Sequence, residues 1–373
     1  MRVVVDYRPA LRARTGVGEY VHHLAAAYAR QQGLDDSLVL FSSSWKDRLS
    51  HVTAPAGTVA ADRRIPVRAL NWLWHRHGWP PIEWLTGPAD VVHAFHPLLI
   101  PAQRAAQVVT VHDLHFLSRP EHSVREIRRD YPLLAARHAR RADAVVTISH
   151  ATARLIEVTF SVPKERIFVC PPGAPSWQHL GRAPNVPRDG YILFVGTLDP
   201  RKNLGSLLDA YALALERQPR LPPLVIAGSM APGAEAWATR WAQAPLAGHV
   251  DYRGYVADTD REALYAGARL LVLPSLDEGF GLPVLEAMSA GIPVLVSNRG
   301  ALPEVAGDAG IVVDPDHTDA FAAQLAWLAT DNDVASAAAT RGLARARTYT
   351  WDAAAAELGR AYASAVARRR ERA

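Results

Sequence analysis

Cysteine and long apolar runs are scarce in this chain. Cys170 is the one cysteine among 373 residues, so no internal disulfide can form, and a reducing compartment is the simplest expectation. No apolar run approaches the ~20 residues of a bilayer-spanning helix, and the first residues lack the apolar stretch of a signal peptide. We therefore expect a cytoplasmic protein, either free or peripheral on the inner membrane face.

Lysine is rare beside arginine. The 41 basic residues include only Lys46, Lys164 and Lys202, so arginine is the ordinary cation of this chain and a lysine is the more informative residue. The net charge is +4, but the basic residues are not interleaved with aromatic ones in an RNA-binding pattern. We expect no nucleic-acid partner.

The chain has the composition of a folded protein and the length of two domains. Apolar residues make up 49% and charged residues 21%, which is normal for globular proteins. Short apolar runs rich in β-branched residues alternate with helical stretches, which predicts doubly wound α/β layers with strands buried on both faces. The predicted strands are 3–6, 38–42, 91–95, 108–112, 144–149 and 167–170 in the first half, and 191–196, 224–228, 250–253, 270–274, 293–297 and 310–314 in the second.

A segment dense in proline and glycine, residues 171–190, predicts a linker between the halves. We expect a first Rossmann-like domain over 1–180 and a second over 181–354, facing each other across a cleft. The alanine-rich end of the chain is helical in pattern. We expect its residues from about 355 to 373 to cross back to the first domain.

Two glycine-bearing or basic loops follow predicted strands. Gly16 and Gly18 open a helix soon after the first strand, where backbone N–H groups approach an anion. Arg201 and Lys202 stand at a strand-to-helix turn, where basic residues oppose the helix dipole. A bound diphosphate would explain that placement, and a solvated basic turn is the alternative.

The segment from Glu278 to Glu286 follows the predicted strand 270–274 and runs into a helix. Its glycines, Gly279 and Gly281, free the backbone to present amides to an anion. Glu286 falls one turn into the helix, where a carboxylate accepts two hydrogen bonds from a vicinal diol such as ribose. The alternative is a loop carboxylate followed by an N-terminal partner of the helix dipole.

Together these motifs resemble the retaining GT-B glycosyltransferases of family 4, the glycosyl transferases group 1, and look closest to bacterial mannosyltransferases. The hallmark of that family is two glutamates separated by seven residues, as in Glu278 and Glu286. The likeness covers nearly the whole chain. Its other motifs are 15–18, 110–114, 146–149, 171–173, 196–204, 254–256 and 349–351.

The resemblance implies a role for each motif residue. Arg201 and Lys202 would clamp the diphosphate, and Glu286 would bind the ribose hydroxyls. Glu278 would position the donor sugar and β-phosphate, while His112 would face the transferred sugar. The remaining donor contacts would come from Gly16, Gly18, Val256, Gly279, Phe280, Gly281 and Leu282.

The implied activity is a retaining hexosyltransferase of the EC 2.4.1 type that needs no metal and no cofactor. Its co-substrate would be a nucleotide-diphosphate sugar, with GDP-mannose preferred, and its acceptor a glycan or a lipid-linked sugar. Two alternatives remain open: a nucleotide-sugar epimerase of similar fold, and a non-catalytic nucleotide-sugar-binding subunit of a glycan-assembly complex. The spacing of Glu278 and Glu286 disfavours the first, and the complete motif set disfavours the second.

Three Asp-x-Asp triplets and a group of histidines are patterns that could indicate a metal site. Asp258-Thr259-Asp260 and Asp314-Pro315-Asp316 resemble metal-binding triplets, but they precede predicted helices and are interpreted as caps, with Thr259 and Glu262 as a capping box. A third triplet, 331–333, falls between helices. His93, His96, His112 and His115 have no zinc-ligand spacing.

An aromatic and basic stretch, 70–79, and an arginine-rich helix, 125–141, are candidates for contact with an acceptor or with anionic lipid. Core tryptophans and a solvated arginine face are the favoured interpretations of the two stretches.

Overall fold

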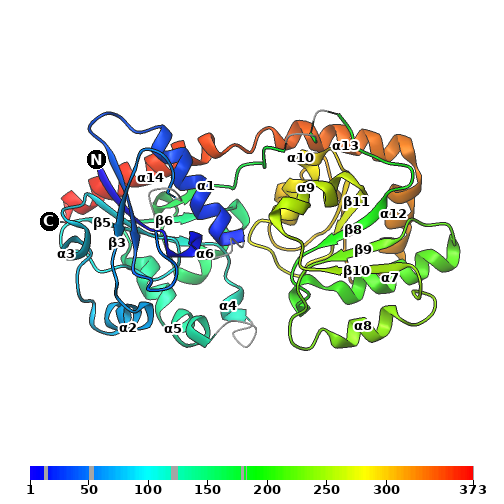
Figure 1. Ribbon diagram of the computed structural model, residues 1–373, viewed down its shortest axis with the longest axis horizontal. Helices are drawn as coiled ribbons and strands as arrows, with labels where there is room; N and C mark the ends of the chain where they lie inside the picture. The colour runs from blue at the N-terminus through cyan, green and yellow to red at the C-terminus, as the bar shows by residue number, and fades with distance from the viewer. Residues whose placement is uncertain (12–15, 50–53, 119–124, 178–179, 182, 373) are drawn as a thin grey trace. The chain divides into compact units, whose positions relative to one another are not determined.

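The computed structural model describes residues 1–11, 16–49, 54–118, 125–177, 180–181 and 183–372, with the backbone alone at 118 and 125–129 (Figure 1). The chain forms two compact units. The first unit comprises Met1–Gly173 and Thr350–Ala373, and the second comprises Ala174–Tyr349. The sequence placed the division at residue 180 and the return of the chain near 355. The terminal helix belongs to the first unit, which confirms its predicted return.

The first unit is built on a seven-stranded sheet in the order β3-β2-β1-β4-β5-β6-β7, and every neighbouring pair is parallel. The six predicted strands are present, and β3 is an addition. At the edge of the sheet β3 has mostly half-buried or exposed side chains, so no continuous apolar run marks it. The strands are β1 (Arg2–Asp6), β2 (Ser37–Ser42), β3 (Thr58–Asp62), β4 (Val91–Ala94), β5 (Ala106–Val111), β6 (Ala144–Thr147) and β7 (Ile167–Val169).

Helices cover both faces of this sheet. Figure 1 shows α1 and α14 on one face and α2 and α5 on the other. The buried side chains of α2 and α5 join alternate residues of the strands in one apolar cluster. The helices are α1 (Gly16–Arg30), α2 (Val67–His77), α3 (Glu83–Thr86), α4 (His115–Ser118), α5 (Arg125–Arg141), α6 (His150–Phe160) and α14 (Trp351–Glu371), with 3-10 turns η1 (Arg8–Ala10) and η3 (Lys164–Arg166).

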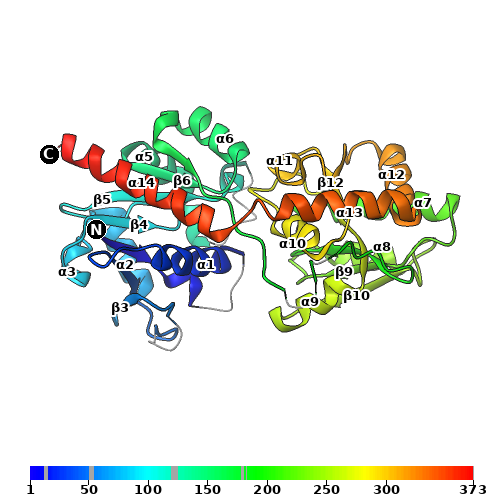
Figure 2. The ribbon, with the colours of Figure 1, turned by 90° about the horizontal axis from the view of Figure 1, so that it is seen from above.

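The returning helix α14 is held by a buried polar contact as well as by packing. It lies along α1 and over β5, β6 and β7 (Figure 2). His93 on β4 is fully buried; its Nδ1 is 2.8 Å from the hydroxyl of Tyr362 on α14, and its Nε2 is 2.8 Å from Thr110 Oγ1 on β5. Burial lowers the pKa of His93 to about 3. The imidazole is therefore neutral and has both nitrogens engaged, a structural role.

The second unit repeats the same winding. Its six parallel strands have the order β10-β9-β8-β11-β12-β13, which matches β3-β2-β1-β4-β5-β6 of the first unit position for position. All six predicted strands are confirmed. They are β8 (Tyr191–Val195), β9 (Leu224–Ala227), β10 (Val250–Gly254), β11 (Ala268–Leu273), β12 (Val294–Ser297) and β13 (Ile311–Val313).

The helix starts of the second unit differ from the predicted caps. Helix α9 begins at Asp258 after Ala257, so Thr259 lies inside the first turn and the capping-box interpretation is wrong. Asp314 and Asp316 pair with Arg299 and do not cap α12, which begins at Thr318. Asp331 caps α13 instead, accepting from the backbone N–H groups of residues 333 and 334. The helices are η4 (Pro200–Lys202), α7 (Leu204–Arg217), α8 (Glu235–Trp241), α9 (Asp258–Ala266), α10 (Leu282–Ala290), α11 (Leu302–Ala306), α12 (Thr318–Thr330) and α13 (Asn332–Ala346).

A close backbone crossing follows β9. At Gly228, φ is +151° and an added Cβ would lie 1.9 Å from the carbonyl oxygen of Gly196. We expect Gly228→Ala to destabilise the second unit by about 3 kcal/mol, because the obstacle is backbone that cannot rotate away. The control is Gly205→Ala in α7, where the new Cβ would make an ordinary 3.6 Å contact and alanine favours the helix. Chemical unfolding of both variants measures this difference, and equal stability would contradict it.

Among the helices that the structure describes, none is both long and apolar enough to cross a bilayer.

Candidate functional site

The sheet of the second unit changes winding direction between β8 and β11, which are neighbours although two strands, β9 and β10, separate them along the chain. In doubly wound sheets, ligands bind outside the carboxyl ends of the strands at this switch point. The loop with Arg201 and Lys202 follows β8, and the loop with Glu278 follows β11. Both motifs therefore stand at the position where the fold forms its ligand site.

Asp199 shapes the basic turn. Its carboxylate accepts hydrogen bonds from the backbone N–H groups of Arg201 (2.9 Å) and Lys202 (3.3 Å), so the 3-10 turn η4 has an acidic cap ahead of its two cations. The Lys202 side chain runs past Gly196, where an added Cβ would lie 3.3 Å from Lys202 Cε. Glycine at 196 thus leaves room for the lysine.

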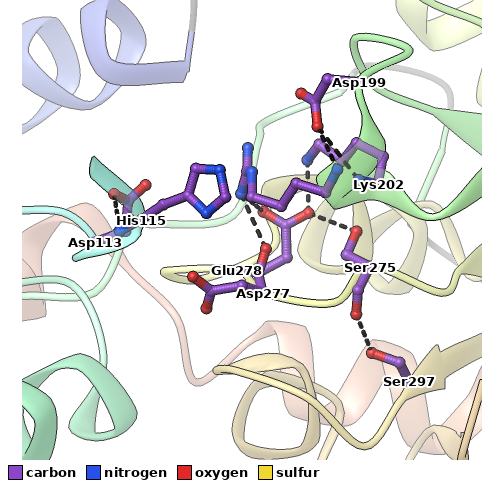
Figure 3. A network of polar contacts seen from close by, with 9 residues as sticks. Asp113, His115, Asp199, Lys202, Ser275, Asp277, Glu278 and Ser297 are labelled. Atoms are coloured by element: carbon purple, nitrogen blue, oxygen red, sulfur yellow. Dashed lines mark hydrogen bonds and ion pairs between the residues drawn. The ribbon is translucent and has the colours of Figure 1, made fainter. Parts of the chain in front are cut away.

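Both cations converge on Glu278 (Figure 3). Lys202 Nζ lies 2.5 Å from Oε1 and Arg201 Nη1 lies 3.0 Å from Oε2, while Ser275 Oγ donates to Oε1 at 2.7 Å. The carboxylate is buried. Burial alone would raise its pKa, but Lys202, Arg201 and Ser275 hold the pKa of Glu278 below its usual value. Glu278 is therefore ionised and keeps two positive charges at fixed positions.

The Glu278 loop is supported from β12 and the residues after it. Ser297 Oγ donates to the carbonyl of Ser275 at 2.5 Å, and Ala301 N–H donates to the carbonyl of Glu278 at 2.9 Å. At Gly300, φ is +57° and an added Cβ would lie 2.6 Å from the Glu278 nitrogen. Sequence reasoning missed these residues, because no motif signals them.

The turn from Gly279 to Gly281 leads into α10. Gly281 occupies the N-cap position with φ +99°, and a Cβ there would lie 2.6 Å from Leu302 Cδ2. Phe280 is buried and meets the Tyr349 ring edge-on at 5.5 Å between centroids. Leu282 begins the helix. The turn thus stands at the positive end of the α10 dipole.

Glu286 lies one turn into α10 and has its own partners. Tyr265 Oη donates to Oε2 at 2.6 Å, and Arg261 Nη2 pairs with Oε1. Burial and the adjacent Glu286 carboxylate raise the pKa of Tyr265 well above its usual value, so this phenol remains a donor. Arg261 was not among the predicted site residues. Val256 stands in the loop between β10 and α9, half-buried.

The predicted site residues of the first unit lie near the ends of β5 and the start of α1. His112 follows β5; its Nε2 is 3.2 Å from the carbonyl oxygen of Phe95, and its ring meets Tyr20 edge-on at 5.3 Å. Burial lowers the pKa of His112. Gly16 is the first residue of α1, exposed, and Gly18 is buried. Thr15, the first residue of that motif, lies outside the described residues.

The remaining candidates from the sequence are the metal ligands, the aromatic stretch 70–79 and the basic helix 125–141. Within the described ranges, no group of three or more histidine, cysteine, aspartate or glutamate side chains is placed to hold a metal ion. In the stretch 70–79, Trp74 is buried, whereas Trp72 and Trp79 are exposed. The side chains of the basic helix at 125–129 lie outside the described residues, and Arg140 donates to the Phe160 carbonyl at 3.2 Å.

Comparison with known proteins matches both units. Residues 180–345 match the family model "Glycosyl transferases group 1", and residues 15–173 match "Glycosyl transferase 4-like domain". An Escherichia coli protein described as O-antigen chain mannosyltransferase B is 30% identical over 373 aligned residues, covering 94% of this chain and 97% of that protein. The O-antigen chain mannosyltransferase RfbU of Salmonella typhimurium is 27% identical, covering 81% and 84%.

A solved structure supports the fold. Sucrose-phosphate synthase from Thermosynechococcus elongatus matches with a TM-score of 0.70 and 20% identity, covering 97% of this chain and 98% of that one. At that level of identity the likeness concerns the fold, which is GT-B, with two Rossmann-like units and a C-terminal helix belonging to the first.

Proposed function

Because the chain belongs to the glycosyl transferases group 1 family and is thus a glycosyltransferase, we propose that it is a retaining hexosyltransferase using a nucleotide-diphosphate sugar. The observation that carries this proposal is the convergence of Arg201 and Lys202 on the buried Glu278 at the β8–β11 switch point. Cleavage of a glycosyl–phosphate bond gives an oxocarbenium-like sugar and an anionic diphosphate. Cations fixed before the reaction stabilise that anion without reorganisation.

The partners of Glu278 favour retention by front-face attack. A double displacement needs a free carboxylate that attacks the sugar carbon. Both oxygens of Glu278 are engaged by Lys202, Arg201 and Ser275, so this group is a poor nucleophile. In the proposed mechanism the acceptor hydroxyl attacks from the side of the leaving group. The departing phosphate oxygen takes its proton, and the anomeric configuration is kept.

We propose the remaining contacts with the donor as follows. The amides of the turn from Gly279 to Leu282, at the positive end of α10, hold the β-phosphate. Glu286, oriented by Tyr265 and Arg261, accepts from the ribose hydroxyls. Val256 lies beside the base. Gly16 and Gly18 contribute amides from the first unit, and His112 acts on the transferred sugar.

Mannose from GDP-mannose is the proposed donor group, because two of the relatives are described as O-antigen chain mannosyltransferases. The proposed acceptor is a glycan or lipid-linked sugar. We propose that the reaction needs neither metal nor cofactor, since Arg201 and Lys202, which keep one net positive charge after pairing with Glu278, act on the diphosphate together with the positive end of α10. A peripheral contact with anionic lipid, through the basic helix α5 or the exposed Trp72 and Trp79, completes the proposal.

Thermal denaturation with GDP, UDP and ADP tests the donor site. We expect GDP to raise the unfolding temperature most, and an unchanged temperature with all three would refute the donor model. Transfer from GDP-mannose with EDTA present should continue, and NMR of the product should show the α-anomer kept from the donor. GDP binding without release of GDP from GDP-mannose would favour the non-catalytic binding subunit. Conversion of the free nucleotide sugar would favour the epimerase.

A further inference from the structure

The linker at residues 171–190 contacts α9 and α10, the two helices that carry Glu286 and its partners. The backbone N–H of Asn185 donates to the carbonyl of Gly291, which follows α10, at 2.7 Å. The Nδ2 of the same asparagine donates to the carbonyl of Ala266, the last residue of α9, at 3.0 Å. This part of the linker is therefore bound to both helices.

Trp177 extends this contact to a buried tyrosine. Its indole lies against the ring of Tyr265, with 5.0 Å between the centroids and 36° between the planes. Tyr265 is fully buried and donates its hydroxyl to Glu286 Oε2 at 2.6 Å. The backbone N–H of Ala174 donates to the carbonyl of Tyr349 at 2.9 Å, so the linker is also held on the other side of Trp177. One row of contacts joins the linker to the carboxylate proposed to bind the ribose.

Helix α9 has few buried residues of its own to fix Tyr265. All nine of its residues, Asp258–Ala266, are described, and only Leu264 and Tyr265 are buried. The helix follows β10, the strand at the edge of the sheet. A short helix is held mainly by the packing of its apolar side chains. The position of the Tyr265 ring, and with it the position of its hydroxyl, therefore depends on the indole of Trp177.

The carboxylate of Glu286 needs this support because a vicinal diol sets a strict geometry. Tyr265 donates to Oε2 and Arg261 donates to Oε1. An ionised carboxylate accepts at about four lone-pair sites, so roughly two are left, one for each ribose hydroxyl. Hydrogen bonds weaken steeply outside a narrow range of angle and distance. A small displacement of Tyr265 would turn the carboxylate and weaken both bonds to the ribose.

We propose that Trp177 is a positioning residue for the nucleotide: it fixes Tyr265, and through Tyr265 it fixes the carboxylate of Glu286 that selects a ribose over a 2′-deoxyribose. The proposal rests on the proposed role of Glu286 as the acceptor of the ribose hydroxyls, and it adds the linker to the donor site. The alternative is that Trp177 only packs the linker onto the second unit. That role would affect stability and leave the preference for ribose unchanged.

A second tryptophan–tyrosine pair of the same unit gives a matched control. Trp241 on α8 lies against Tyr252 on β10, with 5.5 Å between the centroids and 33° between the planes. The Tyr252 hydroxyl donates to the carbonyl of Gly228 at 3.0 Å, a group outside the proposed donor contacts. The two pairs pack alike, but one tyrosine donates to the carboxylate of Glu286 and the other to the backbone.

Isothermal titration calorimetry of a nucleoside diphosphate and of its 2′-deoxy analogue measures the preference for ribose. The nucleotide is whichever of GDP, UDP and ADP raises the unfolding temperature most. The wild type should bind the ribonucleotide about tenfold to 100-fold more tightly than the deoxy form, the effect of one hydrogen bond to a charged group. Trp177→Ala should lose most of this preference, because ribonucleotide binding weakens about tenfold and binding of the deoxy form changes much less.

Two further variants separate positioning from packing. Trp177→Phe keeps an aromatic ring against Tyr265 and should retain the preference for ribose. Trp241→Ala should bind both nucleotides as the wild type does. Cooperative thermal unfolding shows whether each variant is folded. If Trp177→Ala does not fold, Trp177→Leu, which keeps apolar volume without the aromatic face, replaces it in the same measurement.

Tyr265→Phe tests the route from Trp177 to Glu286. Removal of the hydroxyl should itself reduce the preference for ribose. Trp177→Ala in that background should reduce the preference little further, because both changes release the same carboxylate. Effects that multiply independently in the double variant would show that Trp177 does not act through Tyr265, and would overturn the proposal.

The possible failures are distinguishable. An unchanged preference for ribose in Trp177→Ala would overturn the positioning role and leave the donor site intact. A wild type that binds the ribonucleotide and the deoxy form equally would overturn ribose recognition by Glu286, and the role of Trp177 with it. A wild type that binds none of the three nucleotides would overturn the donor proposal itself.

Discussion

Alanine at Lys202 is expected to lower kcat/KM for sugar transfer by roughly 100-fold to 1000-fold, the loss seen when one fixed charge stabiliser is removed from a transition state. Lys202 Nζ contacts Glu278 Oε1 at 2.5 Å. Its removal takes a cation from the leaving group and leaves the buried carboxylate with Arg201 and Ser275 alone. Arg201→Ala should lower kcat/KM by a similar factor, because Arg201 holds the other carboxylate oxygen of Glu278, Oε2. Steady-state kinetics with GDP-mannose would measure both.

The matched control is Arg217→Ala on α7. Arg217 is half-exposed and pairs with the exposed Asp319, so its loss should change stability by less than about 1 kcal/mol and leave kinetics unaltered. The GDP thermal shift distinguishes loss of the Lys202 charge from loss of the folded structure. Lys202→Ala should still unfold cooperatively, but GDP should no longer raise its unfolding temperature. Unchanged turnover in Lys202→Ala or Arg201→Ala would exclude the diphosphate clamp.

Acid should unfold the first unit well before the second. Burial lowers the pKa of His93 to about 3 and the pKa values of His75 and His138 to about 4, against 6.5 for an exposed histidine. Below pH 6.5 the unfolded chain binds protons that the folded chain excludes. Stability is therefore full above pH 6.5 and is lost as the pH falls. At pH 5 each histidine costs roughly 2 kcal/mol, by the linkage of proton binding to folding.

Chemical unfolding at pH 7.5, 6.0 and 5.0 would measure this loss. His138 Nδ1 accepts from the Leu99 N–H at 2.9 Å, and the amide oxygen of an asparagine side chain can take that place. His138→Asn should therefore keep the hydrogen bond and flatten the pH dependence. His317→Asn, at an exposed position of the second unit, should leave the pH dependence of stability as it is in the wild type. Equal pH dependence in both variants would contradict the assignment to buried neutral histidines.

The strands were predictable to the extent that their burial is continuous. β11 (Ala268–Leu273) is buried throughout and was evident as an apolar run. β3 (Thr58–Asp62) was missed, because at the sheet edge only Ala61 is buried. Helix starts were harder to predict. Asp258 and Asp331 both precede or begin helices, but only Asp331 has the extended backbone that directs its carboxylate to the following N–H groups.

The site was predictable where each motif lies within one loop, as Arg201 and Lys202 do after β8 and Glu278 does after β11. The carboxyl ends of adjacent parallel strands share one edge of the sheet, so the approach of Lys202 to Glu278 follows from strand order. Arg261 reaches Glu286 from a different helix, and the position of α9 relative to α10 has no sequence signature.

The return of α14 has a consequence for synthesis. The second unit, Ala174–Tyr349, is inserted between the two segments of the first. During translation the first unit therefore waits for its last helix while roughly 180 residues are added, an interval of roughly 10–35 s at ordinary elongation rates. Until then His93 lacks Tyr362, and the strand face that α14 covers is open to water. The second unit can close first, and the nascent first unit is the part that exposes apolar surface for longer.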